Sequence, residues 1–67
     1  MTIYEEDLVE VRKKYPEATE YELRILYLRE DSYSYGGIQK LMGNPSKKEI
    51  RQILLKFNPE LIDVRTF

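Results

Sequence analysis

Residues 32–57, SYSYGGIQKLMGNPSKKEIRQILLKF, decide how this chain is interpreted. The first half of the stretch has an apolar face at helical spacing, formed by Ile38, Leu41 and Met42. Gly43 follows that face, and glycine commonly ends a helix in a left-handed conformation. A second helical pattern begins beside Pro45, a residue favoured at the first position of a helix. The stretch therefore predicts two helices, over about residues 34–42 and 46–57, joined by a tight turn.

The second of these helices has two competing starts and a clear division into an inner and an outer face. Asn44 before Pro45 offers one N-cap, and Ser46 followed by Glu49 offers a capping box. The inner stripe keeps the i, i+3, i+4, i+7 spacing of an amphipathic helix through Ile50, Ile53, Leu54 and Phe57. The outer arc carries Lys48, Gln52 and Leu55, with Arg51 and Lys56 beside it and Lys47 near the start. We expect this arc to meet solvent or a partner.

The N-terminal half predicts two more helices, over about residues 4–15 and 19–30. The first has the apolar stripe Tyr4, Leu8, Val11 and Tyr15. Its acidic first turn and basic last turn match the helix dipole. The second begins with the capping box Thr19-x-x-Glu22, and its apolar surface is broad, formed by Leu23, Ile25, Leu26, Tyr27 and Leu28. So broad a surface is typical of a central helix contacted from more than one side.

The predicted fold is therefore an all-α bundle of four helices in one domain. Residues 59–62 add a fifth element if they form one more short turn. The apolar tail residues can fold back on the bundle or make a dimer contact: Leu61, Ile62, Val64 and Phe67. The chain of 67 residues is near the lower size limit for a self-sufficient core.

Composition excludes several functional classes. The sequence has no cysteine and no histidine, which removes disulfides, thiolate metal sites and the commonest general base. We therefore expect no enzyme, no cofactor and no metal. The sequence also lacks a signal peptide, and it has no apolar run long enough to span a bilayer. Both absences favour a cytoplasmic protein that does not enter the membrane.

Charge is segregated along the chain. Residues 1–31 carry nine acidic and five basic side chains, whereas residues 32–67 carry six basic and three acidic ones. The basic half contains the two helices around Gly43. This polarity suits a small protein that presents one face to phosphate, although chance segregation is the alternative in so short a chain.

Residues 18–57, ATEYELRILYLREDSYSYGGIQKLMGNPSKKEIRQILLKF, resemble the promoter-reading domain of bacterial sigma factors and related helix-turn-helix regulators of phage. The shared features are a Thr/Ser-x-x-Glu start, an L-x-x-L-x-L-R segment and a helix that opens with S-Y-x-x-I. The S-Y-G-x-I-x-x-L-x-G-N-P segment is also similar to the DNA-binding helices of DNA alkyltransferases, whose reactive cysteine is missing here. Two departures from the sigma pattern are Gln39 in place of alanine and one extra residue between Gly43 and Ile50.

The resemblance implies that the second helix of the pair is a recognition helix. The residues that match its groove-facing positions are Lys47, Lys48, Arg51 and Gln52. We therefore predict a double-stranded DNA-binding helix-turn-helix protein, a small transcription regulator of a phage or mobile element, acting as a homodimer or with a host transcription protein. The predicted DNA contacts are Lys47, Lys48, Arg51, Gln52, Lys56, Tyr35 and Lys40.

Alternatives remain at several of these positions. The basic outer arc can be an ordinary solvated face, and Tyr35 can belong to the edge of the core. Gly36 and Gly37 can reflect the close approach of a neighbouring helix or a phosphate strand, or only a frayed helix start. The competing function is a helical interaction module that inhibits or redirects a host protein. It would use the acidic first half or an exposed patch at Leu55.

Overall fold

The computed structural model describes residues 3–43 and 45–63 of the chain. The described elements are the helices α1 (Glu5–Lys14), α2 (Glu20–Glu30), α3 (Tyr35–Met42) and α4 (Lys47–Phe57), and the 3₁₀ turn η1 (Pro59–Leu61). No strand occurs in this part of the chain, which confirms the all-α prediction. Each predicted range extends past the observed helix by its cap residues only, and the predicted short turn after α4 is present.

Side-chain caps fix where three of the helices begin. Thr19 and Glu22 form the predicted capping box: the Glu22 N–H donates to the Thr19 hydroxyl at 3.2 Å, and the Thr19 N–H donates to the Glu22 carboxylate at 2.9 Å. Ser34 caps α3 through its hydroxyl. Ser46 caps α4 by accepting from the Glu49 N–H at 3.0 Å. Of the two predicted starts of α4, the one at Ser46 is therefore correct.

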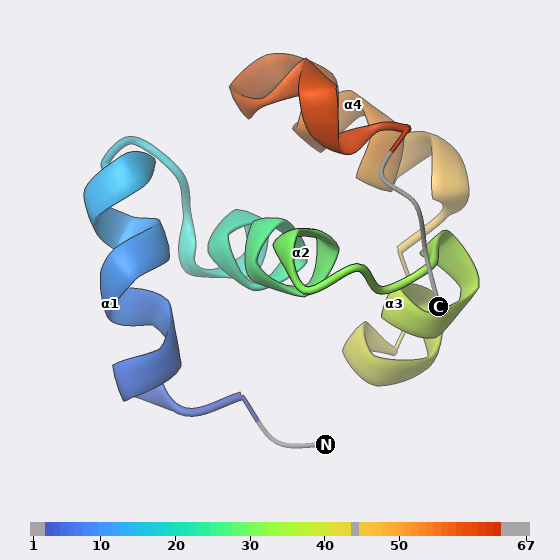
Figure 1. The fold of residues 1–67 in the computed structure, drawn as a ribbon. Coiled ribbons are helices and arrows are strands. Elements are labelled where there is room, and N and C mark those ends of the chain that lie inside the picture. The colour runs from blue at the N-terminus through green and yellow to red at the C-terminus, as the bar shows by residue number, and fades with distance from the viewer. Residues whose placement is uncertain (1–2, 44, 64–67) are drawn as a thin grey trace.

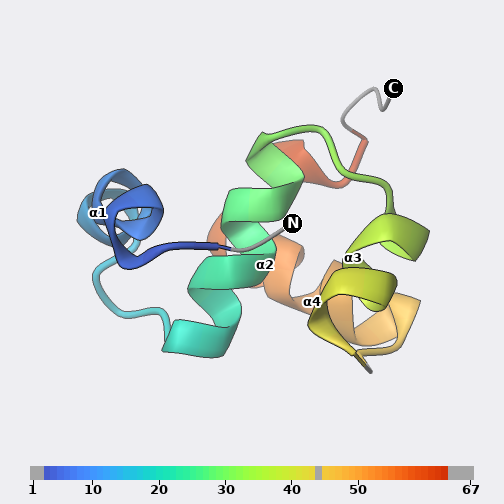
Figure 2. The same cartoon turned by 90° about the horizontal axis from the view of Figure 1, so that it is seen from below.

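Helix α2 is the centre of the molecule. Figures 1 and 2 show α1 on one side of α2 and the pair α3 and α4 on the other. Helices α2, α3 and α4 contact one another in all three pairs, and η1 packs on α4. The apolar residues of α2 point in several directions, and four of them are buried: Leu23, Ile25, Leu26 and Leu28. The prediction of a central helix is confirmed, because each side of α2 has a neighbour to cover it.

Two predicted core residues are in fact exposed. Tyr4 is 60% exposed, because its backbone is extended and its side chain leaves the helical stripe before α1 begins at Glu5. Leu41 is 37% exposed. Helix α3 has only about two turns, and Ile38 alone is fully buried there, so Leu41 lies at the rim of the core.

The segment after α4 is held by Arg29 of α2, a residue that the sequence patterns did not single out. Arg29 is only 4% exposed. Its guanidinium donates to the backbone oxygens of Leu61 at 2.6 Å, Ile62 at 2.7 Å and Tyr33 at 2.8 Å. Leu61 is buried and Ile62 packs against the core, so the predicted fold-back of the tail is confirmed for these two residues. Val64 and Phe67 lie outside the described residues.

A polar junction at Tyr15 joins the ends of α1, α2 and α4. The Tyr15 hydroxyl donates to Glu30 at 3.0 Å and accepts from the Asn58 side-chain amide at 2.9 Å. Lys14 donates to the other oxygen of Glu30 at 3.0 Å. Burial, the largest effect, raises the pKa of Tyr15; the hydrogen bond from Asn58 lowers it, and the hydrogen bond to Glu30 raises it. The junction therefore fixes three helices through side chains distant in sequence.

Candidate nucleic-acid interface

The connection between α3 and α4 is short and fixed from both ends. It comprises residues 43–46, and Gly43 has φ +93°, the left-handed region predicted for it. The Gly43 N–H donates to the Gln39 backbone oxygen at 3.1 Å. The Gln39 side-chain amide donates to the backbone oxygen of the buried Pro45 at 3.0 Å. Gln39, a departure from the sigma-like pattern, thus holds the turn that orients α4.

No neighbouring helix among the described residues packs closely against the glycines of α3. A Cβ atom built on Gly36 would meet no atom of the described residues within 4 Å. One built on Gly37 would meet only local atoms, the Ser34 hydroxyl at 3.3 Å and the Tyr33 ring at 3.5 Å. The interpretation that a packed helix requires these glycines is therefore wrong. Approach of a phosphate strand to Gly36 stays a prediction.

Helix α4 turns its apolar stripe into the bundle. Ile50, Ile53 and Leu54 are buried in the core cluster. At about 100° per residue, the arc opposite Ile50 consists of Lys48, Gln52 and Leu55. The polar residues predicted as DNA contacts on this helix are all exposed: Lys47, Lys48, Arg51, Gln52 and Lys56. Leu55 lies among them and is 51% exposed.

The cations of α1 and those of α4 differ in their partners. In α1, Arg12 pairs with Glu5 and Glu20, Lys13 with Glu10, and Lys14 with Glu30. The guanidinium of Arg12 lowers the pKa of Glu20 through their hydrogen bond. In contrast, Lys47, Lys48 and Arg51 form no ion pair with a carboxylate among the described residues. Their charge therefore remains available to an external anion.

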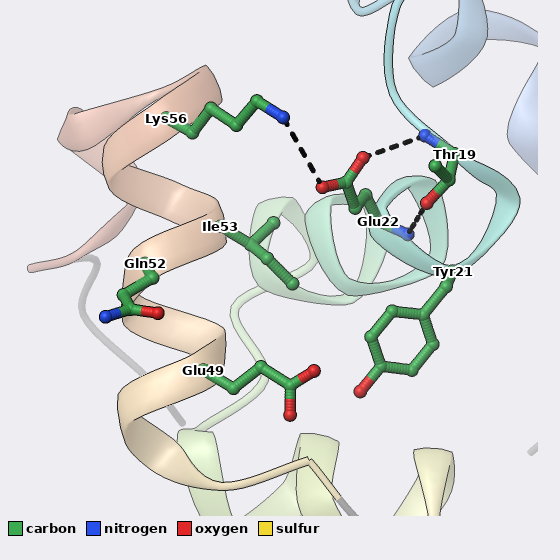
Figure 3. Close-up of a pocket in the computed structure, with 7 residues that line it drawn as sticks. All are labelled: Thr19, Tyr21, Glu22, Glu49, Gln52, Ile53 and Lys56. Carbon is green, nitrogen blue, oxygen red and sulfur yellow. Dashed lines mark hydrogen bonds and ion pairs between the residues drawn. The ribbon is translucent and has the colours of Figure 1, made fainter.

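One flank of α4 faces the start of α2 across a groove of about 310 Å³ (Figure 3). Its lining residues are Thr19, Tyr21, Glu22, Glu49, Gln52, Ile53 and Lys56. Lys56 extends across the groove to within 3.9 Å of the Glu22 carboxylate. Burial, and after it the neighbouring Glu49 carboxylate, raise the pKa of Tyr21. This flank therefore carries negative charge, and the charge of Lys56 is partly balanced within the molecule.

The two predicted DNA contacts on α3 have different surroundings. Lys40 is exposed. Tyr35 is partly buried against the core, its hydroxyl donates to the Ile62 backbone oxygen at 3.3 Å, and the Arg29 guanidinium lies 4.6 Å from its ring centroid. Tyr35 thus occupies the edge of the core, the alternative that the sequence left open, and its hydroxyl already has an acceptor.

Comparison of the chain with protein-family models, curated proteins and solved structures gave no match. Among the described residues, none of the helices has the length and apolar character needed to cross a bilayer. The same part of the chain contains no group of three or more acidic side chains arranged to hold a metal ion. The candidate site is therefore defined by its geometry and charge alone.

Proposed function

We propose that this chain binds double-stranded DNA through the outer face of α4, as a small helix-turn-helix protein. The observation that carries the proposal is the set of three exposed cations Lys47, Lys48 and Arg51 without carboxylate partners in the described part of the chain. They lie on the second of two helices joined by four residues. The contacts of α2, α3 and α4 with one another support the helix-turn-helix assignment, since a three-helix unit commonly presents a recognition helix.

The proposed contacts divide by chemistry. Lys47 and Arg51 lie on the flank of α4 away from the acidic groove and suit phosphates, which cations bind without regard to sequence. Lys48 and Gln52 lie nearer the centre of the arc and suit base edges. Lys56 and Tyr35 contribute less, because Glu22 and Ile62 already engage them.

The number of phosphate contacts limits the affinity of one chain. Three or four cations, with Lys40 as the fourth, release about three or four counterions. A single short helix with so few contacts binds weakly, so useful specificity requires a second copy or joint binding with a host transcription protein. The protein we propose is a transcription regulator of a phage or mobile element that acts through such joint binding.

Fluorescence anisotropy with a labelled 16-base-pair duplex in low-salt buffer tests the proposal. The logarithm of the association constant should fall with the logarithm of salt concentration at a slope of roughly −3 to −4. Lys48→Ala and Arg51→Ala should each weaken binding at an unchanged melting temperature, and Arg51→Ala, which removes a proposed phosphate contact, should reduce the slope by about 1. Lys13→Ala is the matched control, because Lys13 is an exposed lysine on α1. Absence of binding, or an equal effect of the control, would refute DNA recognition by α4.

A second candidate function rests on Leu55. An exposed leucine surrounded by cations can also be the anchor of a protein contact, in which this bundle docks on a host protein. Under this alternative, purified chain retains one host protein from nuclease-treated extract, and Leu55→Ala abolishes the retention. Lys48→Ala would then have little effect, because a rim charge changes affinity only weakly.

A further inference from the structure

The surface of α1 carries a shallow groove of about 380 Å³. Its lining residues are Glu5, Glu6, Val9, Arg12 and Lys13, and all five are exposed. Val9 is the apolar residue among them, 46% exposed, and it lies in the middle of the ten residues of the helix. The described chain therefore leaves one face of α1 uncovered, with an apolar centre and charged borders.

The charges around Val9 are arranged symmetrically and have opposite signs. Glu5 and Glu6 precede it by four and three residues. Arg12 and Lys13 follow it by three and four residues. Residues three or four positions apart share one face of a helix, so all four side chains flank Val9. The face is neutral in sum, acidic toward one end of the helix and basic toward the other, and it is therefore complementary to itself when turned end over end.

A second copy of the chain fits this pattern. Two antiparallel α1 helices that cross at Val9 bring the two valines together on a twofold axis, in an interface that uses the same patch twice. At about 100° per residue, Glu6 and Lys13 both lie about 40–60° to one side of Val9. Glu5 and Arg12 lie at similar angles on its other side. The axis therefore sets Glu6 opposite Lys13 of the second copy, and Glu5 opposite Arg12 of the second copy.

The ion pairs within the chain leave the first of these borders available. The Glu6 carboxylate has no ion-pair partner among the described residues. The Lys13 ammonium lies 4.0 Å from the Glu10 carboxylate, and both side chains are largely in solvent, so this contact contributes little. On the other border, Arg12 lies 3.3 Å from Glu5 of its own chain and keeps that border neutral. The complementarity between copies therefore depends mainly on Glu6 and Lys13.

We propose that α1 is the surface through which two copies of this chain pair, antiparallel and centred on Val9. The contact itself does not require DNA, whereas its use in joint binding to DNA rests on the proposed function. Figures 1 and 2 show α1 and the pair α3 and α4 on opposite sides of α2. Two copies joined through α1 therefore keep both α4 helices uncovered.

The size of the contact limits its strength. A helix of ten residues is about 15 Å long. One crossing of two such helices buries much less than the roughly 800 Å² per partner that is typical of a stable complex. The pair is therefore weak in free solution, with a dissociation constant of about 1 mM. It forms when two chains occupy neighbouring sites on one duplex, because their effective concentration for each other is then on the order of millimolar.

NMR spectra of the ¹⁵N-labelled chain, recorded without DNA at increasing concentration, test the proposal. Between about 0.05 and 2 mM, a range that spans the expected dissociation constant, backbone amide signals should shift progressively. The shifting signals should belong to α1 and centre on Val9. Raising the salt concentration to about 0.5 M should reduce the shifts, because salt screens exposed charges.

Two charge reversals and their mixture test the antiparallel register. Glu6→Lys and Lys13→Glu each set like charges opposite one another, and each should weaken self-pairing about fivefold. Labelled Glu6→Lys chain mixed with unlabelled Lys13→Glu chain again has opposite charges at this border, so its amide shifts should match those of wild type. Glu17→Lys is the matched control, because it makes the same change of charge at an exposed position outside α1. Circular dichroism should show equal helix content in all variants.

The outcomes separate this contact from the proposed function. Constant amide signals up to about 2 mM overturn the contact, and salt-dependent duplex binding in that case leaves DNA recognition intact. Shifts centred on another helix, an equal effect of Glu17→Lys, or a mixture that does not pair also overturn it. Pairing through α1 without binding to any duplex supports the contact and refutes the proposed function. Lys13 contacts no phosphate in this arrangement, so Lys13→Ala still serves as the control for the salt dependence of DNA binding.

Discussion

Replacement of Arg29 with methionine is expected to lower the free energy of unfolding by about 3 kcal/mol. The guanidinium is nearly inaccessible and donates to three backbone oxygens at 2.6–2.8 Å. Hydrogen bonds to a charged group contribute roughly 1.5–3 kcal/mol each. The Tyr33 and Ile62 bonds are only partly buried, so water can replace much of them and the expected loss stays below the sum of about 4.5–9 kcal/mol for three such bonds. A domain of this length has roughly 3–10 kcal/mol of stability in total.

Urea denaturation followed by circular dichroism measures this loss, with the slope of the transition as a check that the unfolded state is unchanged. The melting temperature should fall by roughly 12–24 °C. Arg29→Lys keeps the charge but cannot reproduce the planar fork, so it should lose part of the stability. Arg51→Met is the control, and should change stability by less than about 0.5 kcal/mol at its exposed position. A stability of Arg29→Met within 1 kcal/mol of wild type would refute the reasoning, because burial of the charge would then offset its hydrogen bonds.

Three further predictions concern the turn and the polar junction. Gly43→Ala should destabilise the chain by about 1 kcal/mol or more because of its φ of +93°, whereas Gly36→Ala, with open space around it, should stabilise it by up to about 1 kcal/mol; thermal melts compare the two. Tyr15→Phe should lower the free energy of unfolding by about 1–2 kcal/mol in urea denaturation, since Glu30 and Asn58 each lose their hydrogen bond to the Tyr15 hydroxyl. The folded state raises the pKa of Tyr15 above 10.0, mainly by burial, and the pKa of Lys14 above 10.5, mainly through its hydrogen bond to Glu30. Both groups hold their protons more tightly when folded, so their contribution to the free energy of unfolding should be constant below about pH 10 and decrease above it; a flat alkaline profile, or one whose slope Tyr15→Phe does not reduce, would contradict this.

The inner and outer faces of α4 were predictable because a helix repeats every 3.6 residues. Ile50 and Leu54 were expected inside and are buried, and Lys48 and Arg51 were expected outside and are exposed. The capping box of α2 and the left-handed conformation of Gly43 were equally predictable from the sequence. Each depends on residues within one helical turn of each other. The function of this face stays a prediction, because the chemistry of exposed lysines is the same on a DNA-binding helix and on a solvated one.

The structure adds partners that the sequence patterns could not supply, because these partners are distant in the sequence. Lys56 was predicted as a DNA contact, and Glu22, 34 positions earlier in the chain, lies opposite it and partly balances its charge. Tyr35 was predicted as a DNA contact with the edge of the core as the alternative, and its hydroxyl donates to Ile62. Gln39 looked like a departure from a pattern, and it holds the turn before α4 through Pro45.

The amino-acid sequence by itself determined the helices, their caps and the orientation of α4, since these follow from backbone geometry and from contacts three or four residues apart. Only the tertiary structure decided the role of Arg29, whose acceptors Leu61 and Ile62 lie 32 and 33 positions away. The physical reason is that a buried charge is tolerated only where the fold brings enough acceptors to it. No local sequence pattern predicts these hydrogen bonds, because the acceptors are backbone oxygens, which every residue has.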